Sequence, residues 1–264
     1  MKLELNGQAV YASTGGRDFD ASSKVVVLLH GSGQSHLSWV LQGRYLAYDG
    51  YSILAPDLPG HGLSGGAPLT SIDEMAEWVV GLLDALGVKT ATLVGHSQGV
   101  LVALSAIANH PDRFDKVALI AGALAIPVNA QLVQDSQTAL ETAIENMTSW
   151  GHGQIAQMHD HSQPGHSFLF YGRQLMAANN RQALLADFNA CNAYQSGAVD
   201  AARITIPALV VLAGKDRMTP IRTGRELAGT IKDVKLVEVA DAGHMLPAEA
   251  PDAVNDELVA FLGS

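Results

Sequence analysis

The chain has 264 residues, of which 48% are apolar and 16% charged, and its formal net charge is −10. This composition is typical of a globular protein with a substantial core, and the lack of a basic cluster disfavours nucleic-acid binding. The amino-terminal residues lack the apolar stretch of a secretory signal, and no apolar run approaches the ~18 residues of a membrane span. We expect a cytoplasmic protein without nucleic-acid or membrane partners, as a monomer or small homo-oligomer.

The first predicted element is a small antiparallel hairpin at the edge of a sheet, formed by residues 3–6 and 8–12 around Gly7. Six short runs of apolar and β-branched residues follow along the chain. They are residues 25–29, 52–55, 90–94, 116–121, 208–213 and 234–239. Nearly continuous apolar runs of this length are typical of parallel strands that helices cover on both faces.

A helix is predicted over residues 72–86, between the second and third of these runs. Met75, Val79 and Leu82 recur at spacings of four and three residues, as on the buried face of a helix. Ser71, followed by two acidic residues, is typical of a helix start. The alternation of strands and helices predicts an α/β fold, in which a mainly parallel, twisted sheet has helices on both faces.

The alternation stops near residue 124 and resumes at Ile204, and the residues between them have helical and polar character. An interruption of about eighty residues is too long for a plain connection between two strands. We therefore predict one core domain made of residues 1–123 and 204–264. Residues 124–203 are predicted to form a helical cap subdomain inserted in that core.

One serine stands between two glycines, in the sequence GHSQG at 95–99, after a buried-type strand and before an apolar helix. A sharp turn from strand to helix strains its central residue, and bulky side chains at positions 95 and 99 would clash with it. The amino terminus of the helix also favours negative charge that develops beside the serine. We expect Ser97 to be a nucleophile; a structural turn residue is the alternative, because such glycine spacing also occurs by chance.

A serine nucleophile needs a general base, and the base needs a carboxylate that orients it. Asp216 directly follows one predicted strand, and His244 follows the next. Because the carboxyl ends of parallel strands share one edge of a sheet, both residues are expected on the same edge as Ser97. The chain order serine, aspartate, histidine is that of α/β-hydrolases and differs from those of chymotrypsin and subtilisin.

Together these features resemble the α/β-hydrolase family with a helical cap. The matching segments lie in the family's order outside residues 124–203, and are LLHGSG at 28–33, APDLPGHGLS at 55–64, GHSQG at 95–99, GKDRMTP at 214–220 and AGHMLPAEAP at 242–251. The resemblance implies that Ser97 is the nucleophile, His244 the general base and Asp216 its orienting carboxylate. It also implies that the backbone N–H groups of Ser32 and Gln98 form an oxyanion hole.

Four further residues are expected to have supporting roles, and a fifth is expected to have none. His30 and His61 brace their loops, and Asp57 belongs to the architecture of a Pro-Gly turn. His96 either supports the turn at the serine or lines the substrate pocket, so we include it among the candidate substrate-binding residues. Cys191 is expected to be inert, and as the single cysteine it cannot form an internal disulfide.

The predicted cap contains a group of possible metal ligands, His152, His159, Asp160, His161 and His166. Nitrogen and oxygen ligands this close in sequence are able to hold a divalent metal ion. However, His159 and His161 would point to different sides of a helix, and no cysteine accompanies them. We therefore expect a solvated surface, or a histidine that faces substrate, and neither a metal site nor another cofactor.

The predicted function is a serine hydrolase that cleaves a carboxylic ester of a small or medium-sized molecule through an acyl-enzyme. The same triad serves relatives that cleave lactones, amides or the carbon–carbon bonds of diketones, and these alternatives stay open. A non-catalytic receptor that binds a ligand on the same fold is a further alternative. An epoxide or haloalkane hydrolase would have an aspartate at position 97, where this chain has serine.

The most apolar short run of the predicted cap is SFLFYG at 167–172. A cap that roofs the pocket encloses its ligand, so we predict that Phe168, Phe170 or Tyr171 lines the pocket. The preferred substrates are then short acyl esters, in place of long triglycerides. The alternative is that these aromatic side chains only pack the cap onto the core.

Overall fold

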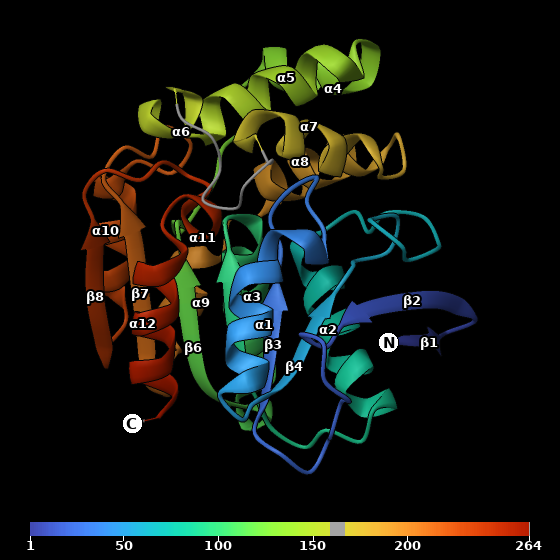
Figure 1. The fold of residues 1–264 in the computed structure, drawn as a ribbon, viewed down its shortest axis with the longest axis vertical. Coiled ribbons are helices and arrows are strands. Elements are labelled where there is room, and N and C mark those ends of the chain that lie inside the picture. Colours follow the sequence, from blue (N-terminus) through green and yellow to red (C-terminus); the bar gives the residue numbers. More distant parts are fainter. Residues whose placement is uncertain (159–166, 264) are drawn as a thin grey trace.

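The computed structural model describes residues 1–158 and 167–263, in which eight strands form one sheet in the order β1-β2-β4-β3-β5-β6-β7-β8 (Figure 1). The strands are β1 (Lys2–Leu5), β2 (Gln8–Ser13), β3 (Val25–Leu29), β4 (Ser52–Pro56), β5 (Ala91–His96), β6 (Phe114–Ile120), β7 (Ala208–Ala213) and β8 (Val234–Val239). Strands β3 to β8 pair in parallel with one another. The predicted α/β fold with a mainly parallel sheet is confirmed.

The predicted hairpin forms the antiparallel edge of this sheet. Strand β1 pairs with β2 in the register Leu5 to Gln8, and β2 continues antiparallel onto β4. At the turn, Asn6 and Gly7 both have positive φ, 51° and 75°. A two-residue hairpin turn requires this conformation, and asparagine followed by glycine adopts it at low cost.

Helices cover both faces of the sheet because alternate side chains of each strand point to opposite sides. Val26 and Leu28 of β3 pack in one apolar cluster, with α1 (Val40–Tyr48) and α12 (Pro251–Leu262). Val27 and Leu29 pack in the opposite cluster. The helices on that side are α2 (Ile72–Ala85), α3 (Gln98–Asn109), α9 (Gly197–Ala202) and α10 (Ile221–Thr230). Short helices η1 (His36–Trp39), η2 (Pro111–Arg113) and α11 (Leu246–Glu249) join these elements. Within 1–158 and 167–263, no helix is long and apolar enough to cross a membrane.

The regular elements that the structure describes between β6 and β7 are all helices. They are α4 (Ala130–Thr138), α5 (Leu140–Gly151), α6 (Gln154–Met158), α7 (Phe168–Ala177), α8 (Ala183–Ala193) and α9. Helices α4 to α8 lie over the carboxyl edge of the parallel strands, whereas α9 lies lower, beside the sheet (Figure 1). Leu132, Ile144 and Phe188 belong to a separate apolar cluster between these helices. Ala201 of α9 instead joins the main core, and the predicted boundaries at 124 and 203 stay a prediction.

Candidate functional site

The chain turns sharply from β5 into α3 at Ser97, which has a φ of 55° and a ψ of −121°. A non-glycine residue rarely adopts such a positive φ, so the surrounding structure must hold it there. A Cβ atom added to Gly95 would lie 2.3 Å from the carbonyl oxygen of Gly99, and one added to Gly99 would lie 2.4 Å from that of Leu29. The two glycines therefore make room for the turn, as predicted.

The structure brings Ser97, His244 and Asp216 together at the carboxyl edge of the parallel strands. His244 Nε2 lies 2.9 Å from Ser97 Oγ, and His244 Nδ1 lies 2.8 Å from Asp216 Oδ2. The three residues follow β5, β8 and β7 and are 8%, 4% and 7% exposed. This is the geometry of a hydroxyl that can pass its proton to an imidazole, which a carboxylate orients through its other nitrogen.

The carboxylate of Asp216 is held by its own loop as well as by His244. Its Oδ1 accepts hydrogen bonds from the backbone N–H groups of Met218 and Thr219, each at 2.8 Å. The Thr219 hydroxyl donates to Oδ2 at 2.7 Å. Burial alone would raise the pKa of Asp216, but the charge of His244 and these hydrogen bonds outweigh it and lower the pKa. Asp216 is therefore a carboxylate at neutral pH. Thr219 was not predicted, although Asp-x-x-Thr is a common turn pattern.

A small chamber of about 10 Å³ surrounds the hydroxyl of Ser97, and Ser32 is part of its wall. Gln98 is the first residue of α3, so its backbone N–H has no acceptor within the helix. The Gln98 side chain points elsewhere and donates to the carbonyl oxygen of Asp187, 3.3 Å away. The oxyanion hole predicted from Ser32 and Gln98 stays a prediction that agrees with these positions.

His96 is among the residues that line the chamber and is 1% exposed. Its Nε2 donates to the backbone carbonyl of His244 at 2.8 Å. Burial, together with the neighbouring His244, lowers the pKa of His96 to about 3. At neutral pH His96 is thus an uncharged ring that holds the backbone of His244, which matches its expected supporting role more closely than contact with substrate.

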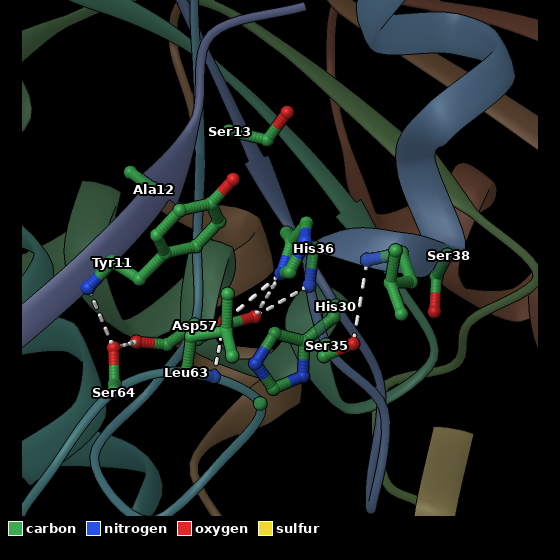
Figure 2. A network of polar contacts seen from close by, with 12 residues as sticks. Tyr11, Ala12, Ser13, His30, Ser35, His36, Ser38, Asp57, Leu63 and Ser64 are labelled. Carbon is green, nitrogen blue, oxygen red and sulfur yellow. Dashed lines mark hydrogen bonds and ion pairs between the residues drawn. The ribbon is translucent and has the colours of Figure 1, made fainter. Parts of the chain in front are cut away.

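Asp57 and His36 form a second buried pair, close to β2 (Figure 2). One oxygen of Asp57 accepts from the backbone N–H of His36 at 2.7 Å and from its Nδ1 at 2.8 Å, and the other accepts from Leu63 N at 2.9 Å. Burial opposes the negative charge, but the hydrogen bonds from His36 and Leu63 outweigh it and lower the pKa of Asp57. The architectural role predicted for Asp57 is confirmed.

His30 joins the loops that follow β3 and β4. Its Nδ1 donates to Gly31 O at 2.9 Å, and its Nε2 accepts from Leu58 N at 3.2 Å. Burial lowers the pKa of His30 to about 4, with the neighbouring His61 adding to the effect. A neutral ring is the form that satisfies both bonds, so His30 braces these loops as predicted.

Asp187 of α8 connects the inserted helices to the loops of the site, and no motif in the sequence points to it. The side chain is completely buried. Its Oδ2 accepts from the backbone N–H of Gly33 at 2.7 Å and from His61 Nε2 at 3.0 Å. Burial alone would lower the pKa of His61, but the charge of Asp187 and its hydrogen bond outweigh it and raise the pKa. His61 braces its loop, as predicted, through this bond.

A larger cavity, of about 310 Å³, lies between η1, α1 and the inserted helices α5 and α7. Phe168 and Tyr171 line it, in agreement with the prediction. Phe170 does not line it, is 64% exposed, and is therefore corrected as a substrate-binding candidate. The reason is the phase of α7, since two residues along a helix turn a side chain by about 200° relative to Phe168.

The remaining candidates of the inserted segment are described only in part. His152 lines the larger cavity, and its Nδ1 donates to Thr148 O at 2.8 Å. His159, Asp160, His161 and His166 lie outside the described residues. Across the described part of the chain, no group of three or more histidine, cysteine or acidic side chains has a metal-binding arrangement.

Cys191 is buried on α8, and its Sγ lies 3.7 Å from the hydroxyl of Ser32. Burial raises the pKa of the thiol to about 12, and the nearby charge of Asp187 adds to the effect. A thiol of this kind stays protonated at neutral pH, and only the thiolate is a strong nucleophile. The expectation that Cys191 is inert is supported.

Comparison with known proteins gives a consistent family assignment. A family model described as "alpha/beta hydrolase fold" matches residues 24–251. The dihydrolipoyllysine-residue acetyltransferase component of the acetoin cleaving system of Pseudomonas putida is 30% identical over 90% of this chain, which spans only 63% of that relative's length. The putative carbamate hydrolase RutD of Caulobacter segnis is 29% identical over 92% of both chains. The crystal structure of the enol-lactonase from Burkholderia xenovorans LB400 superposes with a TM-score of 0.89 at 25% identity, over all of both chains.

Proposed function

The chain belongs to the alpha/beta hydrolase fold family, and we propose that it is a serine hydrolase that cleaves a carboxylic ester of a small or medium-sized molecule through an acyl-enzyme. The observation that carries the proposal is the unbroken line of hydrogen bonds from Ser97 Oγ through the ring of His244 to Asp216. The strained turn at Ser97 supports it, because the enclosing structure holds the hydroxyl toward the imidazole.

In the proposed reaction, Ser97 Oγ attacks the ester carbonyl while His244 Nε2 takes its proton. Asp216 stabilises the imidazolium that forms and fixes the tautomer of the ring. The negative oxygen of the tetrahedral intermediate accepts from the backbone N–H groups of Ser32 and Gln98. His244 then gives its proton to the departing alcohol. Water attacks the acyl-enzyme by the same route, and no cofactor takes part.

We further propose that residues 124–203 act as a cap that encloses the substrate. Helices α5 and α7 provide walls of the larger cavity, which shares part of its lining with the chamber at Ser97. Hydrogen bonds join these helices to the site from both sides: Met245 N donates to Gly151 O at 2.9 Å, and Tyr171 OH donates to Leu37 O at 3.1 Å. An enclosed site of this kind favours a soluble molecule over a lipid aggregate.

A cyclic ester is the second candidate, because the enol-lactonase of Burkholderia xenovorans LB400 has the same fold over its whole length. A lactone would react by the same steps, with the alcohol remaining attached to the acyl group. Amide and carbon–carbon bond cleavage would use the same residues. The similarity to a putative carbamate hydrolase supports substrates with an amide-like carbonyl as an alternative. A receptor without catalysis would have no need for the complete set of hydrogen-bonded groups. A cytoplasmic location and the oligomeric state stay predictions.

Covalent labelling tests the proposal directly. A fluorophosphonate should form an adduct that mass spectrometry locates on Ser97, and a panel of p-nitrophenyl esters should be hydrolysed. Ser97→Ala should lose both reactions and His244→Gln should lose hydrolysis by several orders of magnitude, since these groups act as a unit. Ser38→Ala, which changes another serine beside the cavity, serves as the control that keeps the adduct. Full hydrolysis in Ser97→Ala would overturn the assignment.

A further inference from the structure

The larger cavity and the chamber at Ser97 are neighbours that share part of their lining. Gln34, Met147, Met176 and Met245 line both spaces. The chamber itself has about 10 Å³, which is about the room that one water molecule needs. The chamber has no room for a substrate tail beyond the reacting carbonyl, and the larger cavity is the neighbouring space that has room for one. Three of the four shared residues are methionines, whose flexible side chains adapt to apolar groups.

The lining of the larger cavity, as far as the structure describes it, has no charged side chain suited to an ionic substrate. Among the described residues that line it, none is aspartate, glutamate, lysine or arginine. The described lining includes one histidine, His152, whose Nδ1 is engaged with Thr148 O. Placing a carboxylate here would strip it of water without an opposing charge, which is costly.

The volume of the cavity limits the size of the tail. Pockets for small ligands are about 300–1,000 Å³, and this cavity, at about 310 Å³, lies at the lower end. Apolar walls are provided by Leu41, Phe168 and Leu175, from the core and from the inserted helices. The acyl group stays attached to Ser97 while water attacks, whereas the alcohol leaves, so an enclosed space fits the acyl side of the substrate better.

We propose that this cavity is the acyl subsite, and that it takes an uncharged apolar chain of a few carbon atoms and rejects acyl chains that end in a carboxylate. The inference rests on the proposed serine hydrolase function. It names a substrate class within that function: neutral short- to medium-chain esters or lactones, as distinct from the half-esters of dicarboxylic acids.

Two esters of equal chain length provide the test. The p-nitrophenyl ester of hexanoic acid and the mono-p-nitrophenyl ester of adipic acid differ at the chain end, where the second has a carboxylate. The expected kcat/KM for the adipate ester is at least about 100-fold lower, because a buried unpaired charge costs several kcal/mol. Equal values for the two esters would overturn the inference and leave the serine hydrolase proposal standing.

A cation added to the wall should restore part of the lost activity toward the charged ester. Leu41 lines the cavity and is half-buried, so in Leu41→Lys the ammonium group can face a bound carboxylate. The hexanoate-to-adipate ratio of kcat/KM should narrow by at least about 10-fold. Leu41→Met, which changes shape without adding charge, should leave the ratio within about twofold of the original.

A lysine at a second, more exposed position provides a test that remains valid if Leu41→Lys does not fold. Val40 also lines the cavity but is 43% exposed, so Val40→Lys places its charge without burying it. An unchanged ratio in both lysine variants, with hexanoate still hydrolysed, would show that the acyl chain lies elsewhere and would overturn the inference. If neither ester acylates Ser97 in the unmodified protein, the proposed function fails and the inference fails with it.

Discussion

The carboxylate of Asp187 accepts a hydrogen bond from the backbone N–H of Gly33, 2.7 Å away, and so joins helix α8 to the loop that follows β3. Gly33 is the neighbour of Ser32, whose N–H is proposed to hold the oxyanion. The same carboxylate oxygen accepts from His61 at 3.0 Å. Because oxyanion stabilisation depends on donors fixed at hydrogen-bond distance, Asp187 is expected to act as a positioning residue.

Asp187→Asn should lower kcat by about 10-fold and change KM much less. The amide keeps the shape but replaces the charge that holds His61, so the loop with Ser32 loses its fixed position. Asp200→Asn is the matched control, since Asp200 is also a buried aspartate of the inserted segment and bonds to Tyr194 OH, away from this loop. If Asp187→Asn and Asp200→Asn change kcat by the same factor and KM by the same factor, Asp187 has only a structural role.

Asp216→Asn should reduce kcat by about 10³–10⁴-fold and leave the fold intact. The amide can donate a hydrogen bond to His244 Nδ1, which favours the tautomer with its proton on Nε2, and this nitrogen must accept the proton of Ser97. Thr219→Val removes the hydroxyl that donates to Asp216 Oδ2 at 2.7 Å and should have a smaller effect, about 10-fold. Steady-state kinetics and the rate of fluorophosphonate labelling provide the two measurements. A kcat/KM for Asp216→Asn close to that of the unmodified protein would contradict the proposed role.

The central strands of the sheet could be predicted from the sequence because they are buried on both faces. The runs at 25–29 and 208–213 match β3 and β7 at both ends, since all their residues face helices and must be apolar. Ser97, Asp216 and His244 could be placed together because the ends of parallel strands share one edge. For such residues, topology alone determines the position.

The burial of Asp187 and the exposure of Phe170 could not be predicted from the sequence. Both residues lie on inserted helices, α8 and α7, whose orientation depends on packing against the core and leaves no periodic signal in the sequence. Asp187 is 0% exposed, although a lone aspartate in a predicted surface helix is expected to face water. Phe170 is exposed although it is aromatic, because the residues at 168, 171 and 172 face the cavity. Contacts between distant elements decided both positions.

Stability should fall in mild acid because two histidines are buried in the neutral form. Burial lowers the pKa of His30 to about 4 and that of His96 to about 3. In the unfolded chain both titrate near the ordinary value of about 6.5, so below that pH the unfolded state binds more protons. Each group then lowers the free energy of unfolding by about 1.4 kcal/mol per pH unit until its folded pKa is reached.

Urea unfolding at several pH values between about 7 and about 5 measures this slope. Proton NMR of the folded protein supplies the site-specific control, with His30→Gln assigning one of the two ring signals. Both rings should stay neutral at a pH of about 5. His61 acts in the opposite sense, because its pKa is raised and its contribution is lost as the pH rises through that value. A free energy of unfolding that stays level over this range, with His30 protonated in the folded protein, would refute the prediction.

Gly99→Ala and Gly95→Ala should each destabilise the protein by more than about 3 kcal/mol or prevent folding. The added Cβ would lie 2.4 Å and 2.3 Å, respectively, from a backbone oxygen, so the turn at Ser97 would have to move. Gly81→Ala is the contrasting variant: Gly81 lies inside α2, and its Cβ would meet no atom within 4 Å. It should stabilise the protein by about 0.5–1 kcal/mol, because alanine favours a helix. Thermal or urea unfolding of the three variants measures the predicted loss of stability in two of them and the predicted gain in the third. A Gly99→Ala protein of full stability would contradict the packing argument.

Phe168 and Phe170 allow a matched test of the cavity, because the same substitution on one helix changes its wall in one case only. Phe168 is 7% exposed and lines the cavity, whereas Phe170 is 64% exposed and does not. Phe168→Leu removes volume from the wall, so kcat/KM for p-nitrophenyl octanoate relative to butyrate should rise by about 10-fold. Phe170→Leu should leave this ratio within about twofold of its original value.

Chain-length profiles from acetate to palmitate measure the effect in each variant, and leucine is chosen because a buried phenylalanine replaced by alanine costs about 3–5 kcal/mol of stability. Tyr171→Phe adds a second comparison, since it keeps the wall but removes the hydroxyl that donates to Leu37 O at 3.1 Å. Equal changes in the octanoate-to-butyrate ratio for Phe168→Leu and Phe170→Leu would mean that both substitutions act through the stability of the helix and not through the shape of the cavity wall. Greatest activity on the longest chains, increased further by emulsified substrate, would contradict an enclosed acyl cavity, because a 310 Å³ space cannot hold such a chain.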